Sequence, residues 1–339
     1  MSGHRPSLLI AHHPSLDLLD RDALDRISEV ADILDREPLG DWNGPRADAL
    51  LADVEVILGH WGCAPFDATV LDRAPNLGLF AYAAGTVKQT ISPDVLDRDI
   101  RVTSGADANA EPVAEFTLAT ILFANKDVVW QRDVRRTPRD ASLRDFRQAH
   151  DIPVGNYDKT IGIVGASLIG RRVIELLGAF PHLGVALYDP FVSDAEAATL
   201  GVSRMELDEL CATVDILSIH APDLPSTRHM IGTQQLAALR TGATVINTAR
   251  GALLDHEALL AEVSTGRLSA VLDVTDPEPL PDDHPLWALP NVFITPHLAG
   301  SLGSELGRMV DHAIDEIDRW RNGRPARNAI TKEMLPRLA

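Results

Sequence analysis

Residues 160–173 read Thr-Ile-Gly-Ile-Val-Gly-Ala-Ser-Leu-Ile-Gly-Arg-Arg-Val, and their pattern changes abruptly in the middle. Residues 161–164 are apolar and rich in β-branched side chains, which is typical of a buried parallel strand. From Val173 onward the apolar spacing is helical. A tight turn from a buried strand into a helix presents backbone N–H groups and the positive end of the helix dipole. The stretch therefore predicts a phosphate-binding turn.

The glycines of this turn match a dinucleotide-binding fingerprint only in part. Gly165 and Gly170 occupy the first and third positions of G-x-G-x-x-G, where glycine allows the turn and close packing of helix on strand. Ser167 stands where the second glycine is expected. If the turn holds a pyrophosphate, the residues nearest to it are Ser167, Leu168 and Ile169. An imperfect glycine pattern is weak evidence for a dinucleotide site by itself, so the neighbouring sequence has to be considered with it.

The next expected strand supplies that context. It spans residues 185–189 and ends at Asp189, 19 residues after Gly170. A carboxylate in this place accepts hydrogen bonds from the ribose hydroxyls of NAD, whereas it repels the additional phosphate of NADP. Taken alone, Asp189-Pro190 fits a simple turn equally well. Together with the glycine turn, it favours an NAD site.

The composition narrows the class of protein. A chain of 339 residues suggests two domains, and a net charge of −18 argues against a nucleic-acid or anionic membrane partner. The N-terminus does not resemble a signal peptide, and the longest near-apolar run, 116–124, is too short to span a bilayer. Cys63 and Cys211 lack metal-ligand spacing and fit a reduced compartment. We expect a soluble cytoplasmic protein without a metal.

Strands alternate with helices in both halves of the chain, which predicts an α/β fold with two doubly wound parallel sheets. Further strands are expected at 7–11, 54–58, 77–81, 214–220, 243–247, 269–274 and 291–295, and helices at 15–28, from 109 to about 125 and at 303–322. The charged segment 131–151 contains Pro138 and is predicted to be an exposed arm or an irregular segment.

Only the second block of strands carries the glycine turn. We therefore expect an NAD-binding Rossmann domain at 108–304, inserted into a flavodoxin-like substrate domain formed by 1–107 and 305–339. Ligands of open α/β sheets bind beyond the carboxyl ends of the strands. A cleft between the two domains is the expected active site.

Four expected strand ends of the second domain carry polar groups. Arg250 stands beside a glycine, Asp273 and Glu278 lie five residues apart, and His297 follows a proline. His220 ends another strand. Each of these residues is ordinary when taken alone, because arginines, acidic loops and turn histidines are common on protein surfaces. It is unusual, however, to find all of them together at the ends of expected strands.

The order and spacing of these motifs closely resemble those of the D-2-hydroxyacid dehydrogenases. The resemblance covers nearly the whole chain and includes N-A-x-x-V-A-E at 109–115, the acidic stretch from Asp273 and T-P-H-x-A-G at 295–300. It implies NAD-dependent interconversion of a D-2-hydroxy acid and its 2-oxo acid. It also implies a homodimer formed through the cofactor domain, near the 131–151 segment.

The chemistry of that reaction accounts for the residue types. A 2-oxo acid needs a cation that holds its carboxylate and polarises its carbonyl, and Arg250 offers a bidentate fork. It also needs a proton donor that titrates near neutrality, so His297 is the candidate acid/base. Glu278 is expected to orient that imidazole and to favour its protonated form.

The resemblance implies further contacts. Those with NAD fall at Gly165, Ser167, Leu168, Ile169, Asp189, His220, Ala221, Pro222, Thr248, Ala249, Asp273 and His297. Asp273 would hold the nicotinamide carboxamide, and the backbone of Ala84 and Gly85 would hold the substrate carboxylate beside Arg250. His60 is expected to face the substrate tail, where the arginine suited to a phosphorylated tail is missing.

Two other functions remain open at this point. One is an NAD(H)-sensing corepressor, a binding protein that resembles the same family. The other is a phosphite- or formate-type dehydrogenase on the same scaffold. Formate enzymes typically pair the histidine with glutamine, whereas Glu278 stands here, and phosphite is not excluded.

Overall fold

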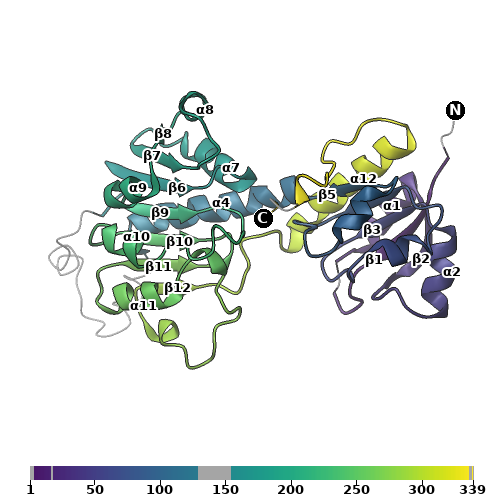
Figure 1. Ribbon diagram of the computed structural model, residues 1–339, viewed down its shortest axis with the longest axis horizontal. Helices are drawn as coiled ribbons and strands as arrows, with labels where there is room; N and C mark the ends of the chain where they lie inside the picture. The colour runs from purple at the N-terminus through teal and green to yellow at the C-terminus, as the bar shows by residue number, and fades with distance from the viewer. Residues whose placement is uncertain (1–3, 17, 129–153, 336–337, 339) are drawn as a thin grey trace. The chain divides into compact units, whose positions relative to one another are not determined.

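The computed structural model describes residues 4–16, 18–128, 154–335 and 338, which divide into two compact units (Figure 1). Unit 1 comprises 1–110 and 301–339, and unit 2 comprises 111–300. The charged segment 131–151 lies outside the described residues. Within the described ranges, no helix is long and apolar enough to cross a membrane.

Unit 1 contains a five-stranded parallel sheet in the order β2-β1-β3-β4-β5, which is the flavodoxin-like order. Its strands are β1 (Ser7–Ala11), β2 (Asp32–Leu39), β3 (Val56–Gly59), β4 (Leu79–Tyr82) and β5 (Arg101–Ser104). Its helices are α1 (Arg21–Val30), α2 (Pro45–Asp53), α3 (Ala68–Leu71) and α12 (Leu306–Arg321), with short 3₁₀ turns η1 (Pro93–Asp97) and η4 (Gly303–Glu305).

Alternating side chains of this sheet build two cores, because successive residues of a strand point to opposite faces. On one face Leu8 and Ile10 pack with Ile27 of α1 and Ile317 of α12. On the other face Leu9 packs with residues of α2, α3 and the C-terminal segment. The inner strands β1, β3 and β4 are buried on both sides, as parallel strands inside a sheet require.

Unit 2 contains a seven-stranded parallel sheet in the order β12-β11-β10-β9-β6-β7-β8 (Figure 1). The strands are β6 (Lys159–Val164), β7 (Leu183–Tyr188), β8 (Ser203–Arg204), β9 (Ile216–Ile219), β10 (Thr244–Asn247), β11 (Ser269–Leu272) and β12 (Val292–Ile294). The helices are α4 (Ala106–Asn125, which begins in unit 1), α7 (Leu168–Leu177), α8 (Asp194–Thr199), α9 (Leu207–Thr213), α10 (Thr233–Ala238) and α11 (His256–Ser264), with η2 (Gly251–Leu253) and η3 (Pro285–Ala288).

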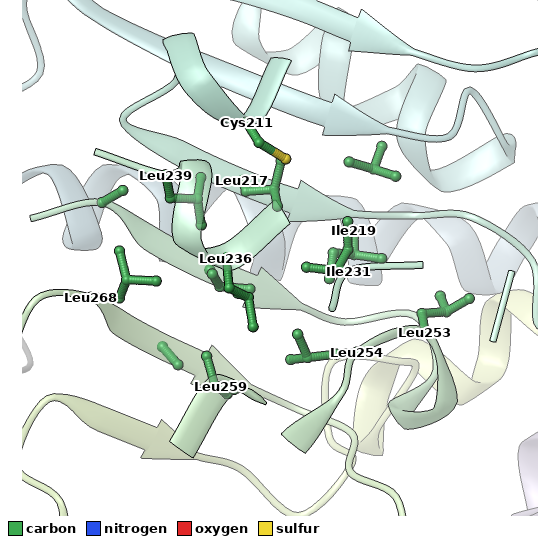
Figure 2. Packing of buried hydrophobic residues seen from close by; sticks show 14 of the residues in the cluster. Cys211, Leu217, Ile219, Ile231, Leu236, Leu239, Leu253, Leu254, Leu259 and Leu268 are labelled. Atoms are coloured by element: carbon green, nitrogen blue, oxygen red, sulfur yellow. The ribbon is translucent and has the colours of Figure 1, made fainter. Parts of the chain in front are cut away.

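The order of these strands reverses between β6 and β9, which creates a Rossmann switch point. Figure 2 shows the core on one face of the sheet, where Leu217 and Ile219 of β9 lie among leucines such as Leu236 of α10 and Leu259 of α11. On the other face β6 packs against α4, α7 and α8. The switch point is therefore held rigidly from both sides.

These two parallel sheets confirm the predicted fold class, with two local differences. The helix expected at 15–28 is α1, which begins at Arg21 because the Asp20 carboxylate accepts a hydrogen bond from the Ala23 N–H at 2.8 Å and caps it. Strand β2 was not predicted. Its sequence Asp-Ile-Leu-Asp-Arg-Glu-Pro-Leu is polar because most of this edge strand is exposed or half-buried.

Candidate active site

The glycine turn after β6 admits no side chain at its two glycines. Gly165 has a φ of +98°, and a Cβ on it would lie 2.7 Å from the backbone nitrogen of Ala221. A Cβ on Gly170 would lie 2.1 Å from the carbonyl oxygen of Gly165. The turn therefore packs directly against the segment that leaves β9, at the switch point of the sheet. This cradle fits a dinucleotide pyrophosphate.

Ser167 caps the helix that follows this turn. Its hydroxyl accepts a hydrogen bond from the Gly170 N–H at 3.3 Å, which makes it the N-cap of α7. The backbone N–H groups of Leu168 and Ile169 belong to the first helical turn, so they have no acceptor within the helix. A serine at this position thus stabilises the helix start and leaves donors for phosphate.

Asp189 lies directly against the glycine turn. Its Oδ2 accepts a hydrogen bond from the Ala166 N–H and its Oδ1 one from the Phe191 N–H, both at 2.8 Å. Arg171 holds the same residue at its carbonyl, since the Arg171 Nε donates to the Ala166 carbonyl oxygen at 2.9 Å. The Arg171 guanidinium also pairs with Glu196 at 2.6 Å. Arg171 and Glu196 were not predicted from the sequence, because the glycine motif does not mark them.

His220 follows β9 and is buried beside the glycine turn. Its Nε2 lies 2.8 Å from the Ser218 hydroxyl, and its buried Nδ1 has no hydrogen-bond partner among the described residues. Burial lowers the pKa of His220 to about 3, so the ring is neutral. Ala221 is buried and Pro222 half-buried immediately after it. An unpaired polar atom at the switch point is consistent with a site that receives a ligand.

The loop after β10 carries Thr248 and Ala249. The Thr248 hydroxyl lies 2.9 Å from the hydroxyl of Thr117 on α4, and the Ala249 N–H donates to the Asn247 side chain at 3.1 Å. Both residues are buried, and they lead into Arg250. Their positions are set by packing and hydrogen bonds within unit 2.

Asp273, at the end of β11, holds the loop that contains His297. Its carboxylate accepts hydrogen bonds from the Leu298 N–H at 2.8 Å, the Ala299 N–H at 2.9 Å and the Thr295 hydroxyl at 2.6 Å. The residue is 2% exposed. This positioning role was missed in the sequence, where Asp273 was assigned only a nicotinamide contact.

His297 is held in an uncommon backbone conformation next to Glu278. Its φ is +53°, and its N–H donates to the carbonyls of Asp273 and Thr295, both at 3.0 Å. The imidazole Nδ1 lies 2.6 Å from Oε1 of Glu278. The side chain of His297 remains 51% exposed, so its ring is accessible to a substrate.

Arg250 begins the loop that packs against the loop of Glu278. Its Nη1 donates to the Ala249 carbonyl at 2.6 Å. Burial lowers the pKa of Arg250, while Asp223 and Glu278 act in the opposite direction. A Cβ on the next residue, Gly251, would lie 2.0 Å from the backbone of Thr275, so the two loops touch through their backbones. The structure therefore brings Arg250, Glu278 and His297 onto adjoining loops of unit 2.

The remaining predicted substrate residues belong to unit 1. Ala84 and Gly85 follow β4, and His60 follows β3, at the same edge of the sheet. The Gly85 carbonyl accepts a hydrogen bond from the Ser104 hydroxyl, which fixes this turn. Across the described parts of the chain, no group of three or more His, Cys, Asp and Glu residues could hold a metal ion.

Comparison with known proteins identifies the family. The model named D-isomer specific 2-hydroxyacid dehydrogenase, NAD binding domain, matches residues 128–299. The chain belongs to this family. The match lies within unit 2, which spans residues 111–300 and contains the glycine turn and Asp189.

The chain is similar to proteins that are named for different activities. The D-3-phosphoglycerate dehydrogenase of Mycobacterium tuberculosis is 35% identical over 280 residues, which are 81% of this chain and 51% of that protein. The chain thus spans about half the length of the phosphoglycerate dehydrogenases that it matches. The glyoxylate reductase of Thermofilum pendens is 31% identical over 94% of both chains. A crystal structure of a Thermus thermophilus protein, 30% identical, superposes with a TM-score of 0.74 over 96% of this chain and 100% of that one.

Proposed function

We propose that this D-2-hydroxyacid dehydrogenase family member interconverts a D-2-hydroxy acid and its 2-oxo acid with NAD, and that His297 is the acid/base. The contact between His297 Nδ1 and Glu278 carries the proposal. A carboxylate oxygen accepts, so Nδ1 bears a proton and Nε2 is the nitrogen that exchanges a proton with substrate. In the proposed reaction NAD carries the hydride.

Arg250 is proposed to bind the substrate carboxylate and to polarise the reacting carbonyl. A guanidinium presents paired N–H donors that match a carboxylate, and its partial burial strengthens that attraction. Its loop is fixed against the loop of Glu278 through Gly251. Arg250 and Glu278 are therefore placed by one backbone contact, as positioning of a catalytic group requires.

Different residues are proposed to bind the different chemical groups of NAD. The backbone N–H groups of Leu168 and Ile169 would donate hydrogen bonds to the pyrophosphate. Asp189 would accept hydrogen bonds from the ribose hydroxyls, because its two hydrogen bonds to backbone N–H groups leave carboxylate lone pairs available. In addition to its positioning role, Asp273 would accept a hydrogen bond from the nicotinamide carboxamide. The Ala84–Gly85 backbone would hold the substrate carboxylate.

A screen of NADH oxidation with 2-oxo acids, and of NAD reduction with phosphite and formate, tests the proposed activity. We expect turnover with 2-oxo acids and none with phosphite or formate. NADH binding without turnover of any acid would support a sensor and contradict the proposal. A Glu278→Gln variant serves as the matched comparison, because it keeps the size of the side chain and removes its charge.

We also infer a homodimer, formed through unit 2. The support is the family resemblance together with the length of the charged segment 131–151, since segments of this kind are commonly functional. Light scattering at micromolar concentration is expected to give a dimer mass. A monomer mass would end this inference.

We further infer a cytoplasmic protein. Its support is that Cys63 and Cys211 are both free thiols and that burial raises the pKa of each to about 12, which makes them unreactive. Fractionation of the source cells with an antibody is expected to find the protein in the cytoplasm. Recovery outside it would contradict this inference.

A further inference from the structure

Ala166, in the glycine turn after β6, is held at both of its backbone polar groups by charged side chains. Its N–H donates to Oδ2 of Asp189 at 2.8 Å, and its carbonyl oxygen accepts from Nε of Arg171 at 2.9 Å. Asp189 follows β7 and Arg171 lies on α7, so both side chains are fixed against the same turn. The carboxylate that we propose for the ribose and one guanidinium are therefore bound to a single residue.

The Arg171 guanidinium is also paired with a carboxylate. Its Nη2 donates to Oε1 of Glu196 on α8 at 2.6 Å. Glu196 lies at the start of that helix, where its N–H donates to the hydroxyl of the capping residue Ser193 at 3.2 Å. The side chains of Arg171 and Glu196 are 40% and 41% exposed, so a bound ligand can reach them. The charge of Arg171 is thus compensated by Glu196.

The other cations of this region are compensated in the same way. The structure describes residues 154–224 without a gap, and each lysine and arginine in that range has a carboxylate partner. Besides Arg171, these are Lys159 with Asp215, Arg172 with Glu111 and Glu175, and Arg204 with Asp194 and Glu206. Arg171 is the one among them that also donates to the glycine turn.

A phosphate on the ribose would need a cation in this place. NADP carries such a phosphate on the 2′ oxygen, and sites that accept it supply an arginine nearby. A free guanidinium offers a full charge and paired N–H donors to a phosphate, whereas a guanidinium already paired with a carboxylate offers less of both. The pair of Arg171 with Glu196 therefore withholds a cation that is fixed against the residue binding Asp189.

We propose that Glu196 is a specificity residue for the cofactor, because it holds Arg171 and thereby keeps this arginine from a 2′-phosphate. Asp189 would repel the phosphate directly, whereas Glu196 acts through Arg171. The inference rests on the proposed contact between Asp189 and the ribose, and it adds a second determinant of the preference for NAD. Arg171 becomes a phosphate ligand when both carboxylates lose their charge.

Dissociation constants of NADH and NADPH test this inference, measured without substrate from the fluorescence of the bound nicotinamide. The variants are Asp189→Asn, the double variant with Glu196→Gln, and the triple variant that adds Arg171→Gln. The step from single to double variant should tighten NADPH relative to NADH by about 10-fold or more, as a charge-assisted hydrogen bond does. The triple variant should lose that gain.

Glu175→Gln in the Asp189→Asn background is the matched control. Glu175 pairs with Arg172 at 2.7 Å on the same helix, so its replacement changes the net charge equally without touching Arg171. The control should leave the ratio of the two constants unchanged. The ratio also separates specificity from damage to the turn, because a loosened turn would weaken both cofactors alike.

The remaining outcomes would overturn the inference. An equal gain with Glu175→Gln would indicate a general effect of net charge. A gain that survives Arg171→Gln would show that Glu196 repels the phosphate itself, and no gain in the double variant would show that Arg171 does not bind the phosphate. A wild type that binds NADPH as tightly as NADH would contradict the Asp189 contact as well. Absence of turnover with 2-oxo acids would contradict the proposed function without altering these constants.

Discussion

His297 Nδ1 lies 2.6 Å from Oε1 of Glu278, and this contact joins the loops that follow the neighbouring strands β11 and β12. The backbone next to His297 is also fixed, because Asp273 accepts hydrogen bonds from the N–H groups of Leu298 and Ala299, the two residues that follow the histidine. One buried carboxylate thus fixes the loop while a more exposed carboxylate fixes the ring. This arrangement leaves Nε2 as the ring nitrogen that is available to a substrate.

Replacing Arg250 by lysine should reduce both substrate binding and turnover. Lysine keeps the charge but loses the planar fork, which we propose serves the carboxylate in the ground state and the carbonyl in the transition state. We expect kcat/KM for the oxo acid to fall by about 10²-fold or more, with effects on both KM and kcat. Steady-state kinetics check this. A change in KM alone would limit Arg250 to substrate binding.

Asp189 should make the enzyme prefer NADH to NADPH. Its carboxylate, fixed against the glycine turn, would repel the 2′-phosphate. Asp189→Asn keeps an oxygen that can accept from the Ala166 N–H but removes the charge. The ratio of kcat/KM for NADH to that for NADPH should therefore fall by about 10-fold or more, equivalent to ~1.4 kcal/mol. Equal use of both cofactors by the wild type would contradict this prediction.

The buried neutral histidines should make the fold sensitive to acid. Burial lowers the pKa of His60 and of His220 to about 3, whereas a histidine in the unfolded chain titrates near 6.5. Between these values only the unfolded chain takes up the proton. The free energy of unfolding therefore falls as the pH drops below about 6.5, by up to ~1.4 kcal/mol per pH unit for each ring.

Thermal midpoints between pH 7.5 and pH 4.5 measure this effect. The decline should be smaller in His60→Gln than in the wild type, because one proton-linked group has been removed. His13→Gln alters an exposed neighbour and should decline as the wild type does. Parallel declines in all three proteins would show that His60 is not a source of the acid sensitivity.

Much of the fold could be predicted from the sequence because the inner strands of both sheets are buried on both faces and are therefore apolar runs. Edge strand β2 could not, since its residues are mostly polar. Asp189 and the glycines were marked by a motif whose spacing reflects local geometry. The contact between Gly251 and Thr275 joins residues brought together by sheet order, so nothing in the local sequence reveals it.

For the candidate site, the structure gives the positions of the predicted residues, while their roles stay predictions. Arg250, Glu278 and His297 were chosen from their chemistry and their places at strand ends, and the structure puts them on adjoining loops. Asp273 looked like a ligand-binding residue, although the structure shows it binding three groups of the histidine loop. Side-chain hydrogen bonds of this kind depend on tertiary structure, which a motif does not encode.

Glu278→Gln should lower turnover in both directions of the reaction. In the proposed mechanism His297 gives a proton to the oxo acid during reduction and takes it back during oxidation. Glu278 accepts from Nδ1 of His297 at 2.6 Å and thereby directs Nε2 to the substrate, whereas an amide can also turn its NH₂ group toward the ring. We expect kcat to fall in both directions while the dissociation constant of NADH stays the same. Unchanged kcat values would mean that Glu278 does not position the histidine.

The turnover number of His297→Ala tests the central claim most directly. If His297 delivers the proton, kcat for the oxo acid should fall by roughly 10²–10⁴-fold, which is the usual contribution of a positioned acid/base. The dissociation constant of NADH, measured on the same sample, should change little because the proposed phosphate and ribose contacts lie elsewhere. A variant that keeps near-wild-type turnover would contradict the assignment of His297 as the acid/base.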